Sequence, residues 1–410
     1  MNQLPLLNSF FRTVFCGVLL LVPFFGPAQS PSVWTGGEGE FEDGGNWHPR
    51  GIPAAETPVE ISSGTVLWNE SDRFQLSRAS ETVIKGGTLR LSGSFRNGRG
   101  SAGSILLEKG GIEHSGNFFV LGHDAPGHIV QRGGSLRSTV TSGFYFSDLS
   151  RSDVVYEQHG GEVHIRYINR DELSPSWQFL LGRARNDRWT LHDGSVRIET
   201  GNGRFVPSGV LSSLYNRAVI LARSSRLELK DGRFLIDRPA ELAVGYRTPG
   251  NTVLHVAGGH FELREAFGED AAIVLGTAAE GVLDMRGGEL KVSVDQPNPE
   301  RQTALLLGRD GGFGMVDMRG GLLDLGSLNL LFAKGENSVG QFNMRGGTLR
   351  VGTIAMAEVG SYGRFIFSGG EIFLEGDQRA IVNEAFFQVR GILRAEYLFR
   401  TRQTRLSIRP

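Results

Sequence analysis

Short segments of alternating apolar and polar residues recur along the chain, and a pair of glycines interrupts each of them. The four clearest copies are residues 281–292, 314–325, 340–351 and 363–374. In each copy, one alternating run precedes the glycine pair and a second alternating run follows it. Because successive side chains of a β-strand point to opposite faces, this alternation predicts two half-buried strands in every copy.

The glycine pair is predicted to bend the chain. Leu283 and Met285 lie on one face of the first strand, and Asp284 lies on the other. Met285 and Leu290 are five positions apart, so a straight strand would place them on opposite faces. A bend at the pair returns both to the interior, and glycine permits this bend because it adopts positive φ without steric cost.

Eleven such units can be counted. Glycine pairs end at residues 87, 111, 134, 161, 259, 288, 321, 347 and 370, and Asp-Gly takes their place at 193–194 and 231–232. A third apolar element lies between successive pairs and ends in glycine or alanine, as at Gly122, Gly182, Gly276, Gly308, Ala222, Ala333 and Ala357. Longer units such as 161–194 and 194–232 are expected to carry loops that bulge outward.

Two architectures fit this pattern. In a β-solenoid the glycine pair is a corner, and each unit is one coil that stacks on the next. In an antiparallel meander the pair is a hairpin turn, which places Asp284 opposite Lys291 favourably but Asp317 opposite Asp324 unfavourably. The third element and the coil-length period favour the solenoid. We therefore predict an all-β fold, a right-handed parallel β-helix of about eleven coils.

The N-terminus carries the features of an export signal. Residues 1–28 predict a secretory signal peptide, because Arg12 precedes an apolar run at 14–25 and small residues follow at 26–28. The run is 12 residues long, too short to span a bilayer, and no later stretch is suited to a transmembrane helix. We therefore expect a secreted or cell-surface protein with no transmembrane span in the mature chain.

We assign the β-solenoid repeats to residues 79–378. Two further segments flank them. Residues 29–78 are predicted to form an N-terminal cap and contain Trp34, Trp47 and Trp68. Residues 379–410 are predicted to form a C-terminal cap and edge segment, with seven arginines and two glutamates. Alternation over 398–408 indicates an edge strand whose charges discourage further pairing. Contact with acidic glycans or lipid headgroups is the alternative role of this basic segment.

Composition excludes several classes of protein. Glycine accounts for 58 of the 410 residues, about twice its usual share, and disfavours a helical protein. The formal net charge is −1, so a nucleic-acid partner is not expected. The only cysteine, Cys16, lies in the predicted signal peptide, so thiolate catalysis and a cysteine–zinc site are not expected in the mature chain. We expect no cofactor, no metal and a monomer.

One set of polar residues recurs at a fixed position, three residues before the glycine pair. In successive units this position holds His255, Asp284, Asp317 and Asn343. If coils stack in register, the four form an outward row with a spacing of about 4.8 Å. Glycosidic hydrolysis requires two carboxyls about 5–9.5 Å apart, so Asp284 and Asp317 are candidate catalytic residues, and His255 and Asn343 are candidate binding residues. In the other units the same position holds residues of mixed character, namely Val83, Leu107, Val130, Glu157, Thr190, Glu228 and Ile366, so a solvated outer face is the simpler interpretation.

The segment after the signal peptide resembles the start of many secreted bacterial repeat proteins. It contains Val-Trp-Thr-Gly-Gly at 33–37, Gly-Gly-Asn-Trp at 44–47 and Gly-Ile-Pro at 51–53, and the repeat at 340–349 is similar too. These features are similar to those of autotransporter-associated β-strand-repeat and Gly-Gly-repeat surface proteins, which often carry a PEP-CTERM sorting tail. The resemblance implies a β-helical passenger-like domain at or outside the cell surface, usually without a known activity. The sorting tail is not present here.

Two functional hypotheses follow. The first is a secreted structural or adhesive β-solenoid that contacts glycans or other surfaces without catalysis, with binding spread over several coils. The second is a polysaccharide-degrading β-helix enzyme, a hydrolase or lyase, with a site near residues 255–343. A compact cluster of acidic, basic and aromatic residues on one face would favour the enzyme. Because the sequence indicates no such cluster, the first hypothesis is preferred.

Overall fold

The computed structural model describes most of the chain beyond its N-terminal segment. The described residues are 30–54, 57–69, 75–76, 80–98, 102–147, 153–168, 179–182, 186–200, 219–239, 241–247, 249–266, 271–294, 303–358 and 361–409. The predicted signal peptide at 1–28 lies outside them, as do the loops expected in the two longer units, at 169–178 and 201–218.

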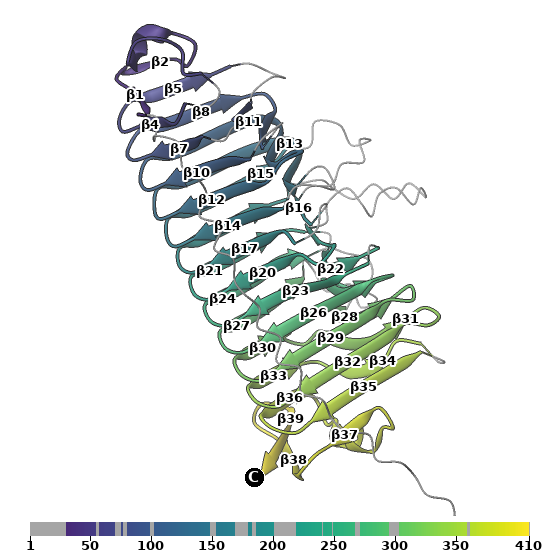
Figure 1. Cartoon of the computed structure of the whole chain (residues 1–410). Coiled ribbons are helices and arrows are strands. Elements are labelled where there is room, and N and C mark those ends of the chain that lie inside the picture. Colours follow the sequence, from purple (N-terminus) through teal and green to yellow (C-terminus); the bar gives the residue numbers. More distant parts are fainter. Residues whose placement is uncertain are drawn as a thin grey trace, which may run out of the picture.

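The described chain winds into a rod of stacked coils (Figure 1). It is a β-solenoid of about 10 turns, which confirms the all-β parallel fold and lies close to the predicted coil count. Away from the two ends, each coil contributes a strand segment to each of three stacks, and neighbouring segments within a stack run parallel. Parallel stacking brings the same position of successive coils together, so a residue's place in the repeat determines its neighbours.

The first stack begins at the N-terminal end of the rod. Its strands are β1 (Ser32–Trp34), β4 (Val59–Ile61), β7 (Glu81–Ile84), β10 (Gly103–Leu107), β12 (Gly127–Gln131), β14 (Val154–Gln158), β17 (Arg188–Leu191), β20 (Arg226–Leu229), β23 (Asn251–Val256), β26 (Glu280–Met285), β29 (Phe313–Met318), β32 (Val339–Met344), β35 (Tyr362–Phe367) and β37 (Phe387–Val389). The short strand β3 (Trp47–His48) pairs antiparallel with β1 and closes this stack.

The second and third stacks complete each coil. The second contains β2 (Glu38–Glu40), β5 (Thr65–Trp68), β8 (Thr88–Ser92), the first parts of β11 (Gly111–Gly122) and β13 (Ser135–Ser147), β15 (Glu162–Tyr167), β18 (Ser195–Glu199), β21 (Arg233–Asp237), β24 (His260–Ala266), β27 (Glu289–Val294), β30 (Leu322–Asp324), β33 (Thr348–Val351) and β36 (Glu371–Glu375). The third contains β6 (Gln75–Leu76), β9 (Phe95–Asn97), the second parts of β11 and β13, β16 (Phe179–Leu181), β19 (Val219–Leu221), β22 (Leu242–Tyr246), β25 (Ile273–Thr277), β28 (Thr303–Arg309), β31 (Asn329–Lys334) and β34 (Ile354–Met356).

The glycine pair is the corner between the first and second stacks, as predicted. In most of these corners the second glycine takes positive φ, for example +80° at Gly321. A Cβ on Gly321 would lie 2.5 Å from the carbonyl oxygen of Gly287 in the preceding coil, so the stacking of corners itself requires glycine. The meander is excluded, because β26 pairs parallel with β29, one coil away.

One corner lies a residue earlier than the glycine pairs predict. Ser135 pairs with Gly111, so Gly110, at φ +74°, lies opposite Gly134. The corner of this unit is therefore Lys109–Gly110, and Gly111 begins β11. The same shift places Leu106, not Leu107, in the outward row with Val130. The prediction failed because it aligned the glycine pairs, whereas the corner depends on the one residue with positive φ.

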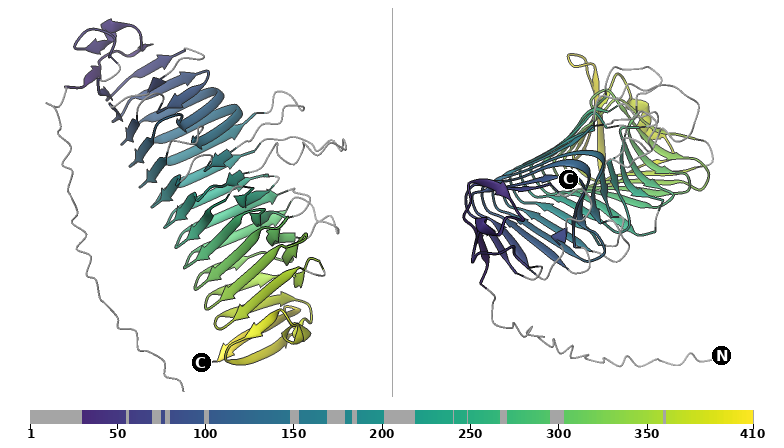
Figure 2. Two further views of the ribbon diagram at one scale, coloured as in Figure 1. Left: turned by 45° about the vertical axis from the view of Figure 1, so that its right-hand side comes forward. Right: turned by 90° about the horizontal axis from the view of Figure 1, so that it is seen from above.

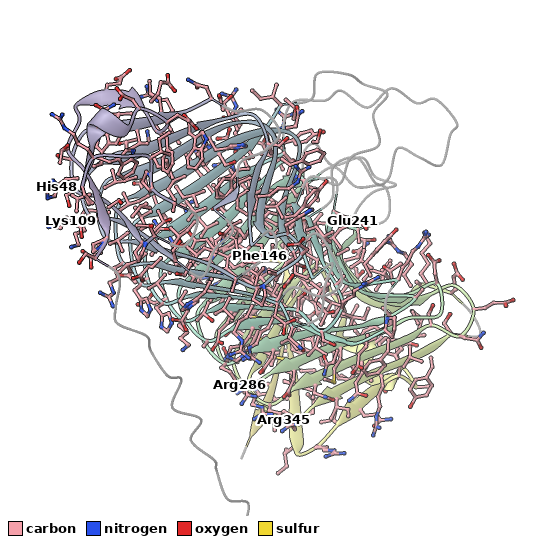
Figure 3. The ribbon with its side chains drawn as sticks, turned by 45° about the horizontal axis from the view of Figure 1, so that its top comes forward. His48, Lys109, Phe146, Glu241, Arg286 and Arg345 are labelled. Atoms are coloured by element: carbon pink, nitrogen blue, oxygen red, sulfur yellow. The ribbon has the colours of Figure 1, made fainter. Side chains whose placement is uncertain are left out.

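Inward side chains form one continuous core along the rod. In the third stack the rings of Phe95, Phe119, Phe144 and Phe179 succeed one another at centroid separations of 4.5, 5.0 and 5.8 Å. Phe146, labelled in Figure 3, is fully buried beside them. Such ring pairs contribute about 0.5–1.5 kcal/mol each beyond the area they bury, which stabilises the parallel register.

A buried carboxylate joins two coils in this region. Asp187 accepts hydrogen bonds from the backbone N–H groups of Val154 (3.0 Å) and Gly182 (2.9 Å) and from the hydroxyl of Ser147 (2.5 Å). Burial raises the pKa of Asp187 to about 7, against the opposing effect of these hydrogen bonds. Asp187 lies between β16 and β17, and its side chain satisfies the buried N–H groups of Val154 and Gly182 while it pairs with the Ser147 hydroxyl.

His114 is a second buried polar group, and its burial leads us to expect that the stability of the fold decreases in acid. Its Nδ1 lies 2.9 Å from the Ser138 hydroxyl and its Nε2 lies 2.9 Å from the Gly93 carbonyl. Burial lowers its pKa from 6.5 to about 4. The neutral ring is therefore favoured in the folded state, and its stabilisation is fully present above pH 6.5 and lost as the pH falls toward 4.

The expected result is a loss of about 3 kcal/mol of unfolding free energy between these pH values from His114 alone. Thermal unfolding midpoints of wild type and His114→Gln, measured from pH 7 to pH 4, test this. The wild-type midpoint should fall more steeply than that of the variant, because the other acid-sensitive groups are common to both. Parallel pH profiles would contradict this role of His114.

The two ends of the rod are built differently (Figure 2). At the N-terminal end Trp34 and Trp47 are buried edge-to-face at 5.1 Å, and Phe41 stacks on Trp68 at 3.8 Å. Parallel pairing already joins β1 to β4 here. At the C-terminal end, after the short helix η3 (Arg379–Asn383), the hairpin of β38 (Ile392–Leu398) and β39 (Gln403–Arg409) continues the second stack by antiparallel pairing of β39 with β36.

The hairpin differs from the edge strand that the sequence indicated over 398–408. The chain turns at residues 399–402, so that β39 lies between β36 and β38, and β38 is the outermost strand. Residues 403–408 of the predicted strand lie in β39, whereas residues 399–402 form the turn. The place of β39 inside the sheet depends on β38, which folds back beside it.

Candidate functional site

The four candidate residues lie side by side in the first stack. His255 pairs with Asp284, Asp284 with Asp317, and Asp317 with Asn343, on strands β23, β26, β29 and β32. The register extends the row to Glu228 on β20. Sequence reasoning therefore predicted the juxtaposition of the four candidates correctly, although His255 and Asn343 are 88 positions apart.

The strands position these side chains through simple alternation. Leu283 and Met285 are fully buried in the core, and the intervening Asp284 points outward. Two positions further along the chain, Arg286 lies on the same outer face just before the corner. Arg319 and Arg345 occupy the equivalent positions of the next two coils, so a row of arginines runs beside the row of acids. Figure 3 shows Arg286 and Arg345 on the same side of the rod.

Asp284 is held by two neighbours. Arg286 donates from Nε to Oδ1 at 2.6 Å and from Nη2 to Oδ2 at 3.1 Å. His255 Nδ1 lies 3.0 Å from Oδ2 and donates to it, because a carboxylate only accepts. Partial burial acts to raise the pKa of Asp284, but the hydrogen bonds and charges of Arg286 and His255 outweigh it, and the pKa is lowered.

Asp317 is held in the same way by arginines of two coils. Arg319 donates from Nε and Nη2 to Oδ2 at 3.0 and 2.8 Å. Arg345 places its Nε 3.5 Å from Oδ1. The carboxylate is largely buried, with 9% of the residue exposed, whereas the Arg345 side chain is 55% exposed. The arginines thus present their free donors to solvent above a shielded acid.

Polar contacts continue at both ends of the row. His255 Nε2 lies 4.0 Å from Glu228 Oε1, and Gln341 donates to the side-chain oxygen of Asn343 at 2.9 Å. We call the connected outer surface the polar strip; it consists of Glu228, His255, Asp284, Arg286, Asp317, Arg319, Asn343 and Arg345. It carries three carboxylates and three guanidinium groups, so its formal charges balance when His255 is neutral.

The side chains of the polar strip are suited to hydrogen bonding and not to the acid catalysis of a glycosidase. A glycosidase general acid needs a carboxyl with a raised pKa, whereas the arginine and histidine beside Asp284 lower its pKa. Within the described ranges, Trp189 is buried against Tyr156 and offers Asp284 no stacking platform; Trp177 lies outside these ranges. In the part of the chain that the structure describes, no group of three or more metal-ligating side chains is brought together.

The arginines of the strip were not among the candidate residues. The spacing Asp-x-Arg in residues 284–286 and 317–319 could have identified them, because residues two apart in a strand share a face. Glu228 occupies the same position of its unit, but sequence reasoning assigned it to the solvated outer face and not to the candidate residues. The helices within the described ranges include none long and apolar enough to cross a membrane.

Fold and site together define a parallel β-solenoid with an ion-paired outer strip. Comparison with protein-family models, with curated proteins and with solved structures finds no match. Functional inference therefore depends on the chemistry of the strip.

Proposed function

We propose that this chain is an exported β-solenoid whose polar strip binds glycans or other extracellular surfaces without catalysis. The observation that carries the proposal is the ion pairing of the strip. Both candidate catalytic acids, Asp284 and Asp317, are held by arginine side chains. Such an arrangement favours a fixed binding surface over proton transfer.

The charge balance of the strip favours a neutral, hydroxyl-rich ligand. Guanidinium groups offer donors and carboxylates offer acceptors, and a sugar hydroxyl uses both. The exposed parts of Arg286, Arg319 and Arg345 amount to 41%, 41% and 55% of their side chains, so these donors are available to a ligand. The spacing of about 4.8 Å between coils repeats them along the rod, which suits an extended chain.

The proposal that the protein is exported depends on the sequence alone. The signal peptide at residues 1–28 and the resemblance to secreted bacterial Gly-Gly-repeat proteins support a location outside the cell. N-terminal sequencing of the exported protein should begin at Gln29.

A glycan array with matched variants tests binding by the strip. Asp317→Asn removes the charge that holds Arg319 and Arg345, and we expect its affinity for the bound glycan to fall about tenfold, equivalent to about 1.4 kcal/mol. Asp324→Asn is the control, since Asp324 pairs with Arg350 at 3.7 Å but lies on β30 in the second stack. The control should bind like wild type.

Equal losses in the two variants, or none in either, would place binding away from the strip.

The enzyme alternative rests on the adjacency of Asp284 and Asp317 in neighbouring strands. It gains support if a glycan is cleaved and Asp317→Asn abolishes the cleavage.

A further inference from the structure

The outermost strand at the C-terminal end has an edge without a partner. Among the described residues, β38 pairs with β39 alone. The N–H and C=O groups along its other edge make no backbone hydrogen bond to any part of the chain that the structure describes. Figure 1 shows the hairpin at the end of the rod. A free edge of this kind is a template for pairing with another strand.

Exposed apolar side chains mark the same hairpin. Ile392 is 69% exposed at the start of β38, and Phe399 is 84% exposed just after its end. They are two of the five large hydrophobic residues found exposed within the described ranges. An exposed edge with exposed apolar ends is what a soluble protein normally covers.

The sequence of β38 is complementary to itself when it runs antiparallel to a second copy. With a two-fold axis at Ala395, Arg394 faces Glu396, and both residues are charged. Leu393 faces Tyr397, and Ile392 faces Leu398. Each contact occurs twice, as two-fold symmetry requires. Opposite charges and apolar pairs are the favourable cross-strand combinations.

The backbone geometry allows the same register. Residues that face each other in it are two, four or six positions apart along β38, so both present their N–H and C=O groups to the same edge. Their side chains also lie on the same face of the sheet. Continuing the register places Phe399 opposite Gly391, which has no side chain to obstruct the ring.

We infer that a second copy of this chain pairs with β38 edge to edge, which joins two rods end to end in a symmetric dimer. This goes beyond the proposed binding function and does not depend on it. A monomer was expected from the sequence, which carries no information about which edge remains open. A single pair of seven-residue strands is a small interface, so the dimer should be weak and concentration-dependent.

A charge exchange across the axis tests this register. In the full chain, Arg394→Glu places two glutamates opposite each other on both sides of the axis, and the dissociation constant should rise about tenfold. Adding Glu396→Arg to this variant restores opposite charges in reversed order, and the dimer should recover. Sedimentation equilibrium over a range of concentrations measures all three proteins.

A cysteine at the axis supplies an independent measurement. In full-length protein carrying Cys16→Ser, Ala395→Cys should form a disulfide with its counterpart on mild oxidation, because opposed residues in antiparallel strands lie within disulfide range. Thr401→Cys, which is exposed in the hairpin turn, should remain largely unlinked. A wild-type protein that stays monomeric at every concentration would overturn the inference. So would a dimer that Arg394→Glu does not weaken, or equal cross-linking of the two cysteine variants.

Discussion

Gly321→Ala is expected to lower the free energy of unfolding by about 4 kcal/mol. Gly321 has φ +80°, a conformation that costs an alanine about 1–2 kcal/mol. The new Cβ would also lie 2.5 Å from the Gly287 carbonyl oxygen and 2.6 Å from the Gly288 carbonyl oxygen. Both contacts are with backbone of the preceding coil, so relief requires the two coils to separate. Chemical denaturation of wild type and variant measures the loss.

Gly326→Ala separates the two causes. Gly326 also has positive φ, +57°, but a Cβ there would meet nothing within 4 Å. We expect a loss of only about 1 kcal/mol. If both variants lost the same stability, corner stacking would contribute nothing, and close packing of the corners would not explain the glycine repeat.

Arg309→Met is expected to destabilise the protein by about 3–5 kcal/mol. Arg309 donates from Nη1 and Nη2 to the two carboxylate oxygens of Glu241, both at 3.0 Å. The two side chains are 9% and 8% exposed. Glu241 lies just before β22 and Arg309 ends β28, two coils along the third stack. The variant leaves the glutamate buried without its counter-charge, and the thermal unfolding midpoint should fall accordingly.

The double variant Glu241→Met/Arg309→Met provides the comparison. Replacing both members of a buried ion pair by apolar residues is commonly far less costly than removing one. The double variant should therefore be more stable than Arg309→Met. A double variant that is less stable than the single one would show that the two side chains stabilise the fold separately.

Much of the fold could be predicted from local pattern. The alternation around Leu283 and Met285 identified the inward face, and the odd spacing to Leu290 required a corner at the glycine pair. The period of the repeat alone was enough to align Asp284 with Asp317. This works because parallel stacking repeats one local geometry, so that residues distant in sequence become neighbours through their position in the repeat.

Other features depend on contacts that periodicity does not encode. The corner at Gly110 was displaced because two glycines follow Lys109 and only one adopts positive φ. The ion pairs of Asp317 depend on side-chain reach between coils, and no spacing rule identifies the pairing of Glu241 with Arg309, 68 positions apart. Asp187 lies outside the repeat pattern altogether. Its role depends on three hydrogen-bond donors, from Val154, Gly182 and Ser147, that the fold brings together between β16 and β17.

The most direct test of the proposed function measures binding and turnover of one glycan on one preparation of the protein. The best ligand from the array is titrated by calorimetry, and its mass and reducing ends are then followed during prolonged incubation with the protein. Binding without catalysis predicts saturable binding and a ligand recovered unchanged. New reducing ends that appear with wild type and disappear with Asp317→Asn would contradict it.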